Sequence, residues 1–141
     1  MIRKTSIAIN NANEVERSAY VAAIFHGVLA TFHKEEKVIL HREYSLSDAN
    51  GKGRFDFTIT QNEDILCVAE VKAEDREYGL CQNLVQIQSA CQNNKKRKHA
   101  SLEYVYGIVT TGGQMVFLSS NFRKQNRSNK GSIISSFKCS K

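Results

Sequence analysis

The spacing of apolar residues along the chain predicts five β-strands. Between Arg54 and Thr60 the alternation is strict: Phe55, Phe57 and Ile59 would lie on one face of a strand, and Asp56, Thr58 and Thr60 on the other. Residues 65–73 (ILCVAEVKA) predict the next strand, and residues 61–64 predict the turn that joins the two strands into a hairpin. Three further strands are predicted at residues 37–44, 103–110 and 114–119, with a loop at residues 45–53.

Two other segments have helical patterns. Asn13 followed by Glu16 is typical of a capping box and predicts a helix that ends near Phe32 or His33. Its apolar side would consist of Ala19, Ala22, Ala23, Val28, Leu29 and Phe32. A second helix is predicted from Tyr78 to about Asn94, with the buried stripe Leu80, Leu84, Ile87 and Cys91 and a neighbouring polar stripe of Gln82, Gln86, Ser89 and Asn93.

The order of these elements is α-β-β-β-α-β-β, which predicts a fold of the α/β class, more narrowly an α+β mixed sheet. Three consecutive strands, a crossover helix and a returning strand give such a sheet with helices on both faces. The 141 residues suffice for one domain, which we place at residues 1–120. Residues 121–141, rich in Ser, Asn, Lys and Arg, are interpreted as a basic C-terminal extension.

Composition predicts an intracellular protein, in the nucleus or the cytoplasm. The sequence contains no apolar run long enough for a membrane span and no signal peptide, so no membrane partner is expected. Four widely spaced cysteines without C-x-x-C spacing favour reduced thiols over a zinc site.

Positive charge is concentrated in the last third of the chain. Ten basic and 13 acidic residues precede Lys95, whereas ten basic residues and one acidic residue lie from Lys95 onward. Such asymmetry predicts contact with nucleic acid, and a solubilising tail is the alternative. The expected phosphate contacts are Lys95, Lys96, Arg97, Lys98, Arg123, Lys124 and Arg127. Residues 95–98 (KKRK) also resemble a nuclear localisation patch.

Two charged residues, Glu70 and Lys72, interrupt the apolar strand at residues 65–73. Because side chains of a strand alternate between faces, both would share one face with Leu66 and Val68. Burying charges is unfavourable unless they are paired or bind an ion. If Thr60 pairs with Leu66 and Thr58 with Val68, Asp56 lies opposite Glu70, and the two carboxylates indicate a site for Mg²⁺ or Mn²⁺. A solvated ion pair on an edge strand is the alternative.

Asp56 followed by Glu70-Val71-Lys72, with 13 residues between Asp56 and Glu70, resembles the D…(D/E)-x-K signature of the PD-(D/E)XK nuclease superfamily. The order of elements from about Asn13 to Ser119 is similar to the restriction-endonuclease-like αβββαβ core of that superfamily, with one extra strand. The residue before Asp56 is Phe55, where the superfamily signature has proline. The layout is also similar to Holliday-junction resolvases and to the nuclease domains of Crinkler effectors.

The resemblance implies roles for individual residues. Asp56, Glu70 and the main-chain carbonyl of Val71 would bind the metal, and Lys72 would be the catalytic lysine. Gln86 would be the helix glutamine that many members add, with Gln82 as the alternative. Glu16 or Glu14 would be the first-helix glutamate that some members add.

The resulting hypothesis is a Mg²⁺- or Mn²⁺-dependent endonuclease that hydrolyses phosphodiester bonds. DNA is favoured over RNA as its substrate, and the sequence does not decide between them. A catalytically inactive nuclease-fold module that binds nucleic acid or a protein is the alternative. The resemblance leaves room for a homodimer and for a fused or separate NTPase.

Overall fold

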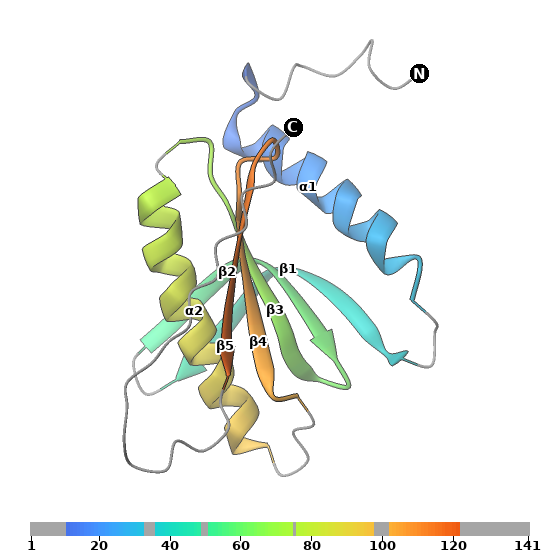
Figure 1. Cartoon of the computed structure of the whole chain (residues 1–141), viewed down its shortest axis with the longest axis vertical. Helices are drawn as coiled ribbons and strands as arrows, with labels where there is room; N and C mark the ends of the chain where they lie inside the picture. Colours follow the sequence, from blue (N-terminus) through green and yellow to red (C-terminus); the bar gives the residue numbers. More distant parts are fainter. Residues whose placement is uncertain (1–10, 33–35, 49–50, 75, 98–101, 122–141) are drawn as a thin grey trace.

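The described residues fold into a five-stranded mixed sheet with one helix on each face. The computed structural model describes residues 11–32, 36–48, 51–74, 76–97 and 102–121. The elements are α1 (Glu14–Leu29), β1 (Val38–Asp48), β2 (Gly51–Gln61), β3 (Asp64–Val71), α2 (Arg76–Lys96), β4 (Tyr104–Thr110) and β5 (Met115–Asn121), as drawn in Figure 1. This confirms the predicted fold class and element order.

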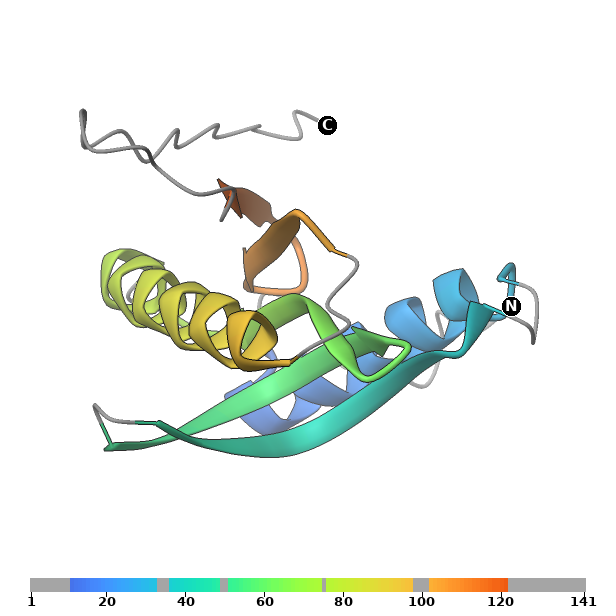
Figure 2. The same cartoon turned by 90° about the horizontal axis from the view of Figure 1, so that it is seen from below.

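The strands lie in the sheet in their order along the chain. β1, β2 and β3 are antiparallel neighbours, β3 and β4 are parallel, and β5 returns antiparallel to β4. A parallel pair needs a crossover connection, and α2 supplies it between β3 and β4. The long hairpin of β1 and β2 curves strongly, as the view from below shows (Figure 2). None of the described helices is long and apolar enough to cross a membrane.

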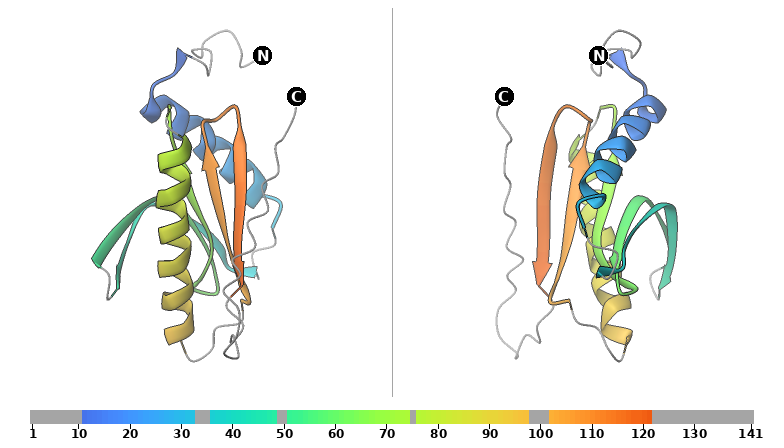
Figure 3. Two further views of the ribbon diagram at one scale, coloured as in Figure 1. Left: turned by 60° about the vertical axis from the view of Figure 1, so that its left-hand side comes forward. Right: turned by 90° about the vertical axis from the view of Figure 1, so that its right-hand side faces the viewer.

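The two helices bury separate cores on opposite faces of the sheet (Figure 3). On the α2 side, Ile87, Ala90 and Cys91 of the helix pack with strand residues that include Phe55, Ile65 and Val68. Leu80 and Leu84 pack at the edge of this cluster, which confirms the predicted apolar stripe of the helix. On the α1 side, Val21, Ala22 and Phe25 pack with Phe57, Cys67, Ala69, Val71 and Ile108.

Helix α1 begins with the predicted capping box but buries a different side. The Asn13 side chain accepts a hydrogen bond from the Glu16 N–H, and the Glu16 carboxylate accepts one from the Asn13 N–H, each at 2.9 Å. The helix ends at Leu29 rather than near Phe32, and Ala19, Ala23, Val28 and Phe32 are exposed. The predicted stripe was wrong at those four positions and right at Ala22, because the buried side of the helix consists of Arg17, Val21, Ala22 and Phe25.

Strand β2 is longer than predicted and places its two phenylalanines in different cores. Residues 51–53, expected in a loop, are part of the strand. Phe55 packs on the α2 side and Phe57 on the α1 side, which contradicts the shared face predicted for them. Glu43 of β1 lies between the pairs Arg42–Phe57 and Tyr44–Phe55, and its φ of 52° interrupts regular strand geometry at that point.

The hairpin of β2 and β3 contains a bulge that the sequence did not reveal. Thr58 pairs with Val68 as predicted, but Thr60 pairs with Ile65 rather than with Leu66. The register shifts between Ile59 and Thr60, so that β3 carries one extra residue. Consequently Leu66 packs against the α1-side core, whereas Val68, predicted to share its face, lies in the α2-side core.

Candidate active site

The predicted catalytic residues lie at the end of β3, where the strand has separated from β2. The pairing of β2 with β3 reaches Phe57 and Ala69, whereas the pairing of β3 with β4 continues to Val71 and Thr110. Beyond it, the Lys72 N–H donates to the Thr110 carbonyl at 2.9 Å. This divergence leaves room between β2 and β3 for side chains in place of a continuous ladder.

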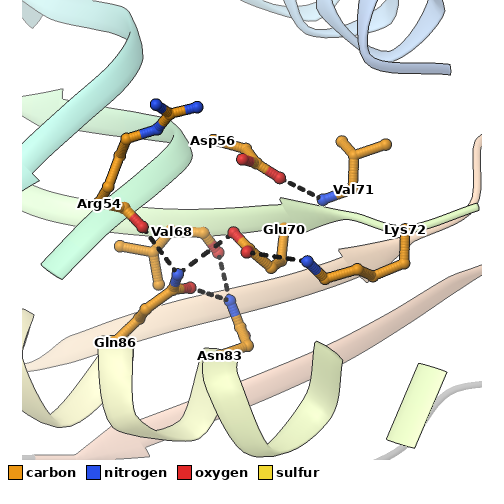
Figure 4. A network of polar contacts seen from close by, with 8 residues as sticks. All are labelled: Arg54, Asp56, Val68, Glu70, Val71, Lys72, Asn83 and Gln86. Carbon is orange, nitrogen blue, oxygen red and sulfur yellow. Dashed lines mark hydrogen bonds and ion pairs between the residues drawn. The ribbon is translucent and has the colours of Figure 1, made fainter. Parts of the chain in front are cut away.

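Glu70 is the centre of a network of polar contacts under α2 (Figure 4). Its side chain is 2% exposed. The Gln86 amide donates to Glu70 Oε2 at 3.2 Å, and Lys72 Nζ lies 3.5 Å from Glu70 Oε1. The main-chain N–H of Asp56 donates to the same carboxylate. A buried carboxylate therefore has three donors, and one of them is a cation.

These donors do not fully offset the burial of Glu70. Desolvation raises the pKa of its carboxyl above the ordinary value, and the nearby charge of Asp56 raises it further. The Gln86 hydrogen bond, the Lys72 charge and the Asp56 N–H act in the opposite direction. Either protonation of Glu70 or a further cation beside it would relieve this unfavourable burial of charge.

Main-chain N–H groups hold the carboxylates of both Asp56 and Glu70. Asp56 Oδ2 accepts a hydrogen bond from the Val71 N–H at 2.9 Å, and Glu70 accepts one from the Asp56 N–H. Asp56 is half-buried and also lines a cavity of about 180 Å³ between α1 and strands β1 to β3. Figure 4 shows the carboxylate of Asp56 turned toward the Val71 main chain and that of Glu70 turned toward Gln86 and Lys72.

Of the two glutamines proposed for the α2 position, Gln86 is the one that reaches the site. Besides Glu70, its Nε2 approaches the Arg54 carbonyl at 3.4 Å. Gln82 does not share these contacts, and its buried Oε1 has no hydrogen-bond partner among the described residues.

Asn83 belongs to the same network, a role that was not predicted from the sequence. Its Nδ2 donates to Gln86 Oε1 at 3.2 Å and to the Val68 carbonyl at 3.3 Å. Because the Gln86 oxygen is engaged by Asn83, its nitrogen faces Glu70. A sequence signal existed: Asn83 lies four residues before Ile87, on the helical face that the apolar stripe buries.

The two candidate glutamates of α1 have different surroundings. Glu16 closes the capping box with Asn13, so its carboxylate already has a structural partner. Glu14 lines the cavity that also contains Asp56. A metal role for Glu16 remains a prediction, and the geometry favours Glu14 of the two.

The predicted phosphate contacts are only partly described. Lys95 and Lys96 are exposed in the last turn of α2. Arg97 pairs with Glu63 at 2.6 Å and with Asp64 at 3.0 Å, so it links the end of α2 to the turn before β3. Lys98, Arg123, Lys124 and Arg127 lie outside the described residues, as does nearly all of the predicted extension 121–141.

Within the described part of the chain, no group of three or more His, Cys, Asp or Glu side chains is arranged to hold a metal ion. Asp56 and Glu70 together supply two carboxylates. Hard cations such as Mg²⁺ commonly bind through one or two carboxylates and keep several waters, so two suffice for such an ion.

The fold is similar to that of a known nuclease. The chain matches the structure of the type IIG restriction endonuclease BpuSI with a TM-score of 0.56 and 16% sequence identity. The match covers 90% of this chain and 14% of that protein's chain. No family model matches the sequence, and no curated protein matches it. The fold of this chain is therefore restriction-endonuclease-like, in agreement with the fold predicted from the sequence.

Proposed function

We propose that this chain is a divalent-metal-dependent endonuclease that hydrolyses phosphodiester bonds in DNA. The buried carboxylate of Glu70 is the observation that carries the proposal. It lies at the diverging end of β3, beside Asp56, Lys72 and Gln86, in a restriction-endonuclease-like fold. A buried acid with a raised pKa and a specific charged neighbour is typical of functional sites.

Asp56, Glu70 and the Val71 carbonyl would hold a Mg²⁺ or Mn²⁺ ion, which polarises a phosphoryl oxygen and acidifies bound water. Their oxygen donors suit a hard cation, and a cation beside Glu70 would offset the burial that raises the pKa of its carboxyl. Glu14 is a better candidate than Glu16 for an additional carboxylate, since it faces the Asp56 cavity.

Lys72 and Gln86 would have distinct tasks. The Lys72 ammonium donates hydrogen bonds, so it can stabilise negative charge that develops on the phosphate in the transition state. Gln86 donates to Glu70 in this structure, so its task is to orient that carboxylate.

DNA is proposed as the substrate for two reasons. The structural neighbour is a restriction endonuclease, and the formal net charge of this chain is +6. A positively charged protein attracts the phosphate backbone regardless of sequence. The proposal does not require a homodimer or an NTPase.

The test combines plasmid nicking with calorimetric titration of Mn²⁺. Asp56→Asn and Glu70→Gln preserve side-chain shape, and Glu74→Gln, at an exposed position just beyond Lys72, is the matched control. We expect the wild type and Glu74→Gln to bind metal and nick DNA, and the two site variants to lose at least about 100-fold in rate. RNA of the same sequence serves as the competing substrate.

Two outcomes would contradict the proposal. Nicking that survives chelation, or that survives in Asp56→Asn, would remove these carboxylates from the chemistry. DNA binding in a gel without metal binding or nicking would instead support the inactive nuclease-fold module.

A further inference from the structure

The first turn of α2 packs directly against the side chain of Lys72. Gly79 is buried there, and a Cβ atom at its position would lie 3.0 Å from Lys72 Cγ and 3.8 Å from Lys72 Cε. The same atom would lie 3.0 Å from a methyl group of Val109 on β4. Glycine weakens a helix relative to alanine, so a glycine at this place indicates a need for space. The space is occupied by the aliphatic stem of Lys72.

The residue before this glycine contacts the other end of the same lysine. The Lys72 ammonium lies 5.8 Å from the centroid of the Tyr78 ring, within the range of a cation–π interaction. The Tyr78 side chain is largely exposed, whereas that of Lys72 is 18% exposed. Lys72 therefore has a carboxylate on one side at 3.5 Å, an aromatic ring near its ammonium, and the backbone of Gly79 along its stem.

We propose that Tyr78 and Gly79 are positioning residues that hold the Lys72 ammonium at the scissile phosphate. This inference rests on the proposed nuclease function. A lysine has four rotatable side-chain bonds, so one ion pair fixes it poorly. A metal ion bound by Glu70 would compete with Lys72 for that carboxylate. The Tyr78 ring and the close packing of Gly79 against the lysine stem are then the contacts that keep the ammonium in place.

Replacing the tyrosine in two ways separates the ring from its hydroxyl group. Tyr78→Phe keeps an aromatic face over the ammonium, and Tyr78→Leu removes it. We expect Tyr78→Leu to lower kcat of plasmid nicking about fivefold with KM within twofold, and Tyr78→Phe to match the wild type. Tyr20→Leu, at an exposed position on α1, is the control and should leave both constants unchanged.

A second measurement does not depend on activity. In NMR spectra, nuclear Overhauser contacts should join the Lys72 ε-methylene group to the ring of residue 78 in the wild type and in Tyr78→Phe. Carbon relaxation of that methylene should show greater mobility in Tyr78→Leu. Gly79→Ala should displace the same group and lower kcat, because its methyl would press against the Lys72 stem. If Gly79→Ala does not fold, the two Tyr78 variants still test whether residue 78 positions Lys72.

The outcomes distinguish this inference from the proposed function. A wild type that never cleaves would overturn the nuclease proposal, while the NMR contacts would still test the placement of Lys72. An active enzyme in which Tyr78→Leu changes neither kcat nor the mobility of Lys72 would overturn the positioning role. Equal losses in Tyr78→Phe and Tyr78→Leu would also overturn it, since they would assign the effect to the hydroxyl group.

Discussion

Replacing Asn94 with alanine should destabilise the protein far more than the same change at the adjacent Asn93. Asn94 is fully buried near the end of α2. Its Oδ1 accepts from the Ile65 N–H at 2.9 Å, and its Nδ2 donates to the Ile65 carbonyl at 2.8 Å. The pairing of β4 with β3 begins at Cys67, so it does not reach Ile65. The asparagine therefore acts as the missing strand neighbour.

The magnitude follows from the two main-chain groups that lose their partner. A buried donor or acceptor left unsatisfied costs about 1–3 kcal/mol. Two such groups would together cost about 2–6 kcal/mol. A water molecule in the space left by the side chain would bond to both groups and bring the cost into the lower half of that range. We expect a loss of about 3 kcal/mol in the free energy of unfolding. That is a large part of the 5–15 kcal/mol typical of a single domain.

The measurement is urea unfolding followed by far-ultraviolet circular dichroism. Asn93→Ala is the matched control, because Asn93 is the adjacent residue of the same type but is only half-buried. Both changes gain equally in helix propensity, so the difference between them isolates the Ile65 contacts. The control should change stability by about 0.5 kcal/mol or less. If the two variants unfold within about 0.5 kcal/mol of each other at the same m-value, the reasoning is refuted.

Three further predictions concern the site and its surroundings. Glu70→Gln should raise the free energy of unfolding of the metal-free protein near pH 7. Because the folded-state pKa of Glu70 is raised, the wild type has its full stability below the ordinary value of 4.5 and loses stability as the pH rises through the raised value. A pH series of unfolding free energies should therefore show the variant's advantage disappearing below 4.5. Gly107→Ala should cost about 1–3 kcal/mol in thermal unfolding, because its methyl would collide with Asn83. Neutralising both Lys95 and Lys96 should flatten the slope of log K against log salt by up to about 1.8 in anisotropy titrations of duplex DNA, and an unchanged slope would remove both from the interface.

Local patterns in the sequence were sufficient for the element order and for most of the site. The capping pair Asn13 and Glu16 defines the start of α1 through contacts within one turn, so no tertiary information was needed. The contact between Glu70 and Gln86 was predictable from the resemblance, because the motif lies on one strand and Gln86 lies on the helix that follows this strand. The apolar side of α1 was not predictable in this way, because alanine and valine occur around the whole helix and packing alone selects among them.

The buried polar residues of α2 were hidden by the assumption that polar means exposed. Asn83, Ile87, Ala90 and Asn94 follow the spacing of one buried helical face, and all four are buried. The predicted polar stripe included Gln86 but neither Asn83 nor Asn94. Their partners are the Val68 carbonyl and the main-chain N–H and carbonyl of Ile65, and a sequence does not reveal which main-chain groups a side chain will reach.

The bulge at Leu66 explains how a short turn and an aligned pair of acidic residues coexist in one hairpin. Asn62 and Glu63 both have positive φ, as a tight two-residue turn requires, and the turn pairs Gln61 with Asp64. Continued without interruption, that register would place Asp56 opposite Ala69. One extra residue in β3 shifts the pairing, so that Phe57 meets Ala69 and Asp56 comes level with Glu70.

The contact of Asn94 with Ile65 lies on the turn side of this bulge, and the contacts of Asn83 and Gln86 lie beyond it. The helix thus holds β3 on both sides of the inserted residue. Because a change of one residue in register would turn Glu70 to the opposite face, fixing the strand at two points keeps the carboxylate toward Gln86 of α2. The contacts of Asn83 and Asn94 with β3 therefore support both the stability of the hairpin and the geometry of the candidate site.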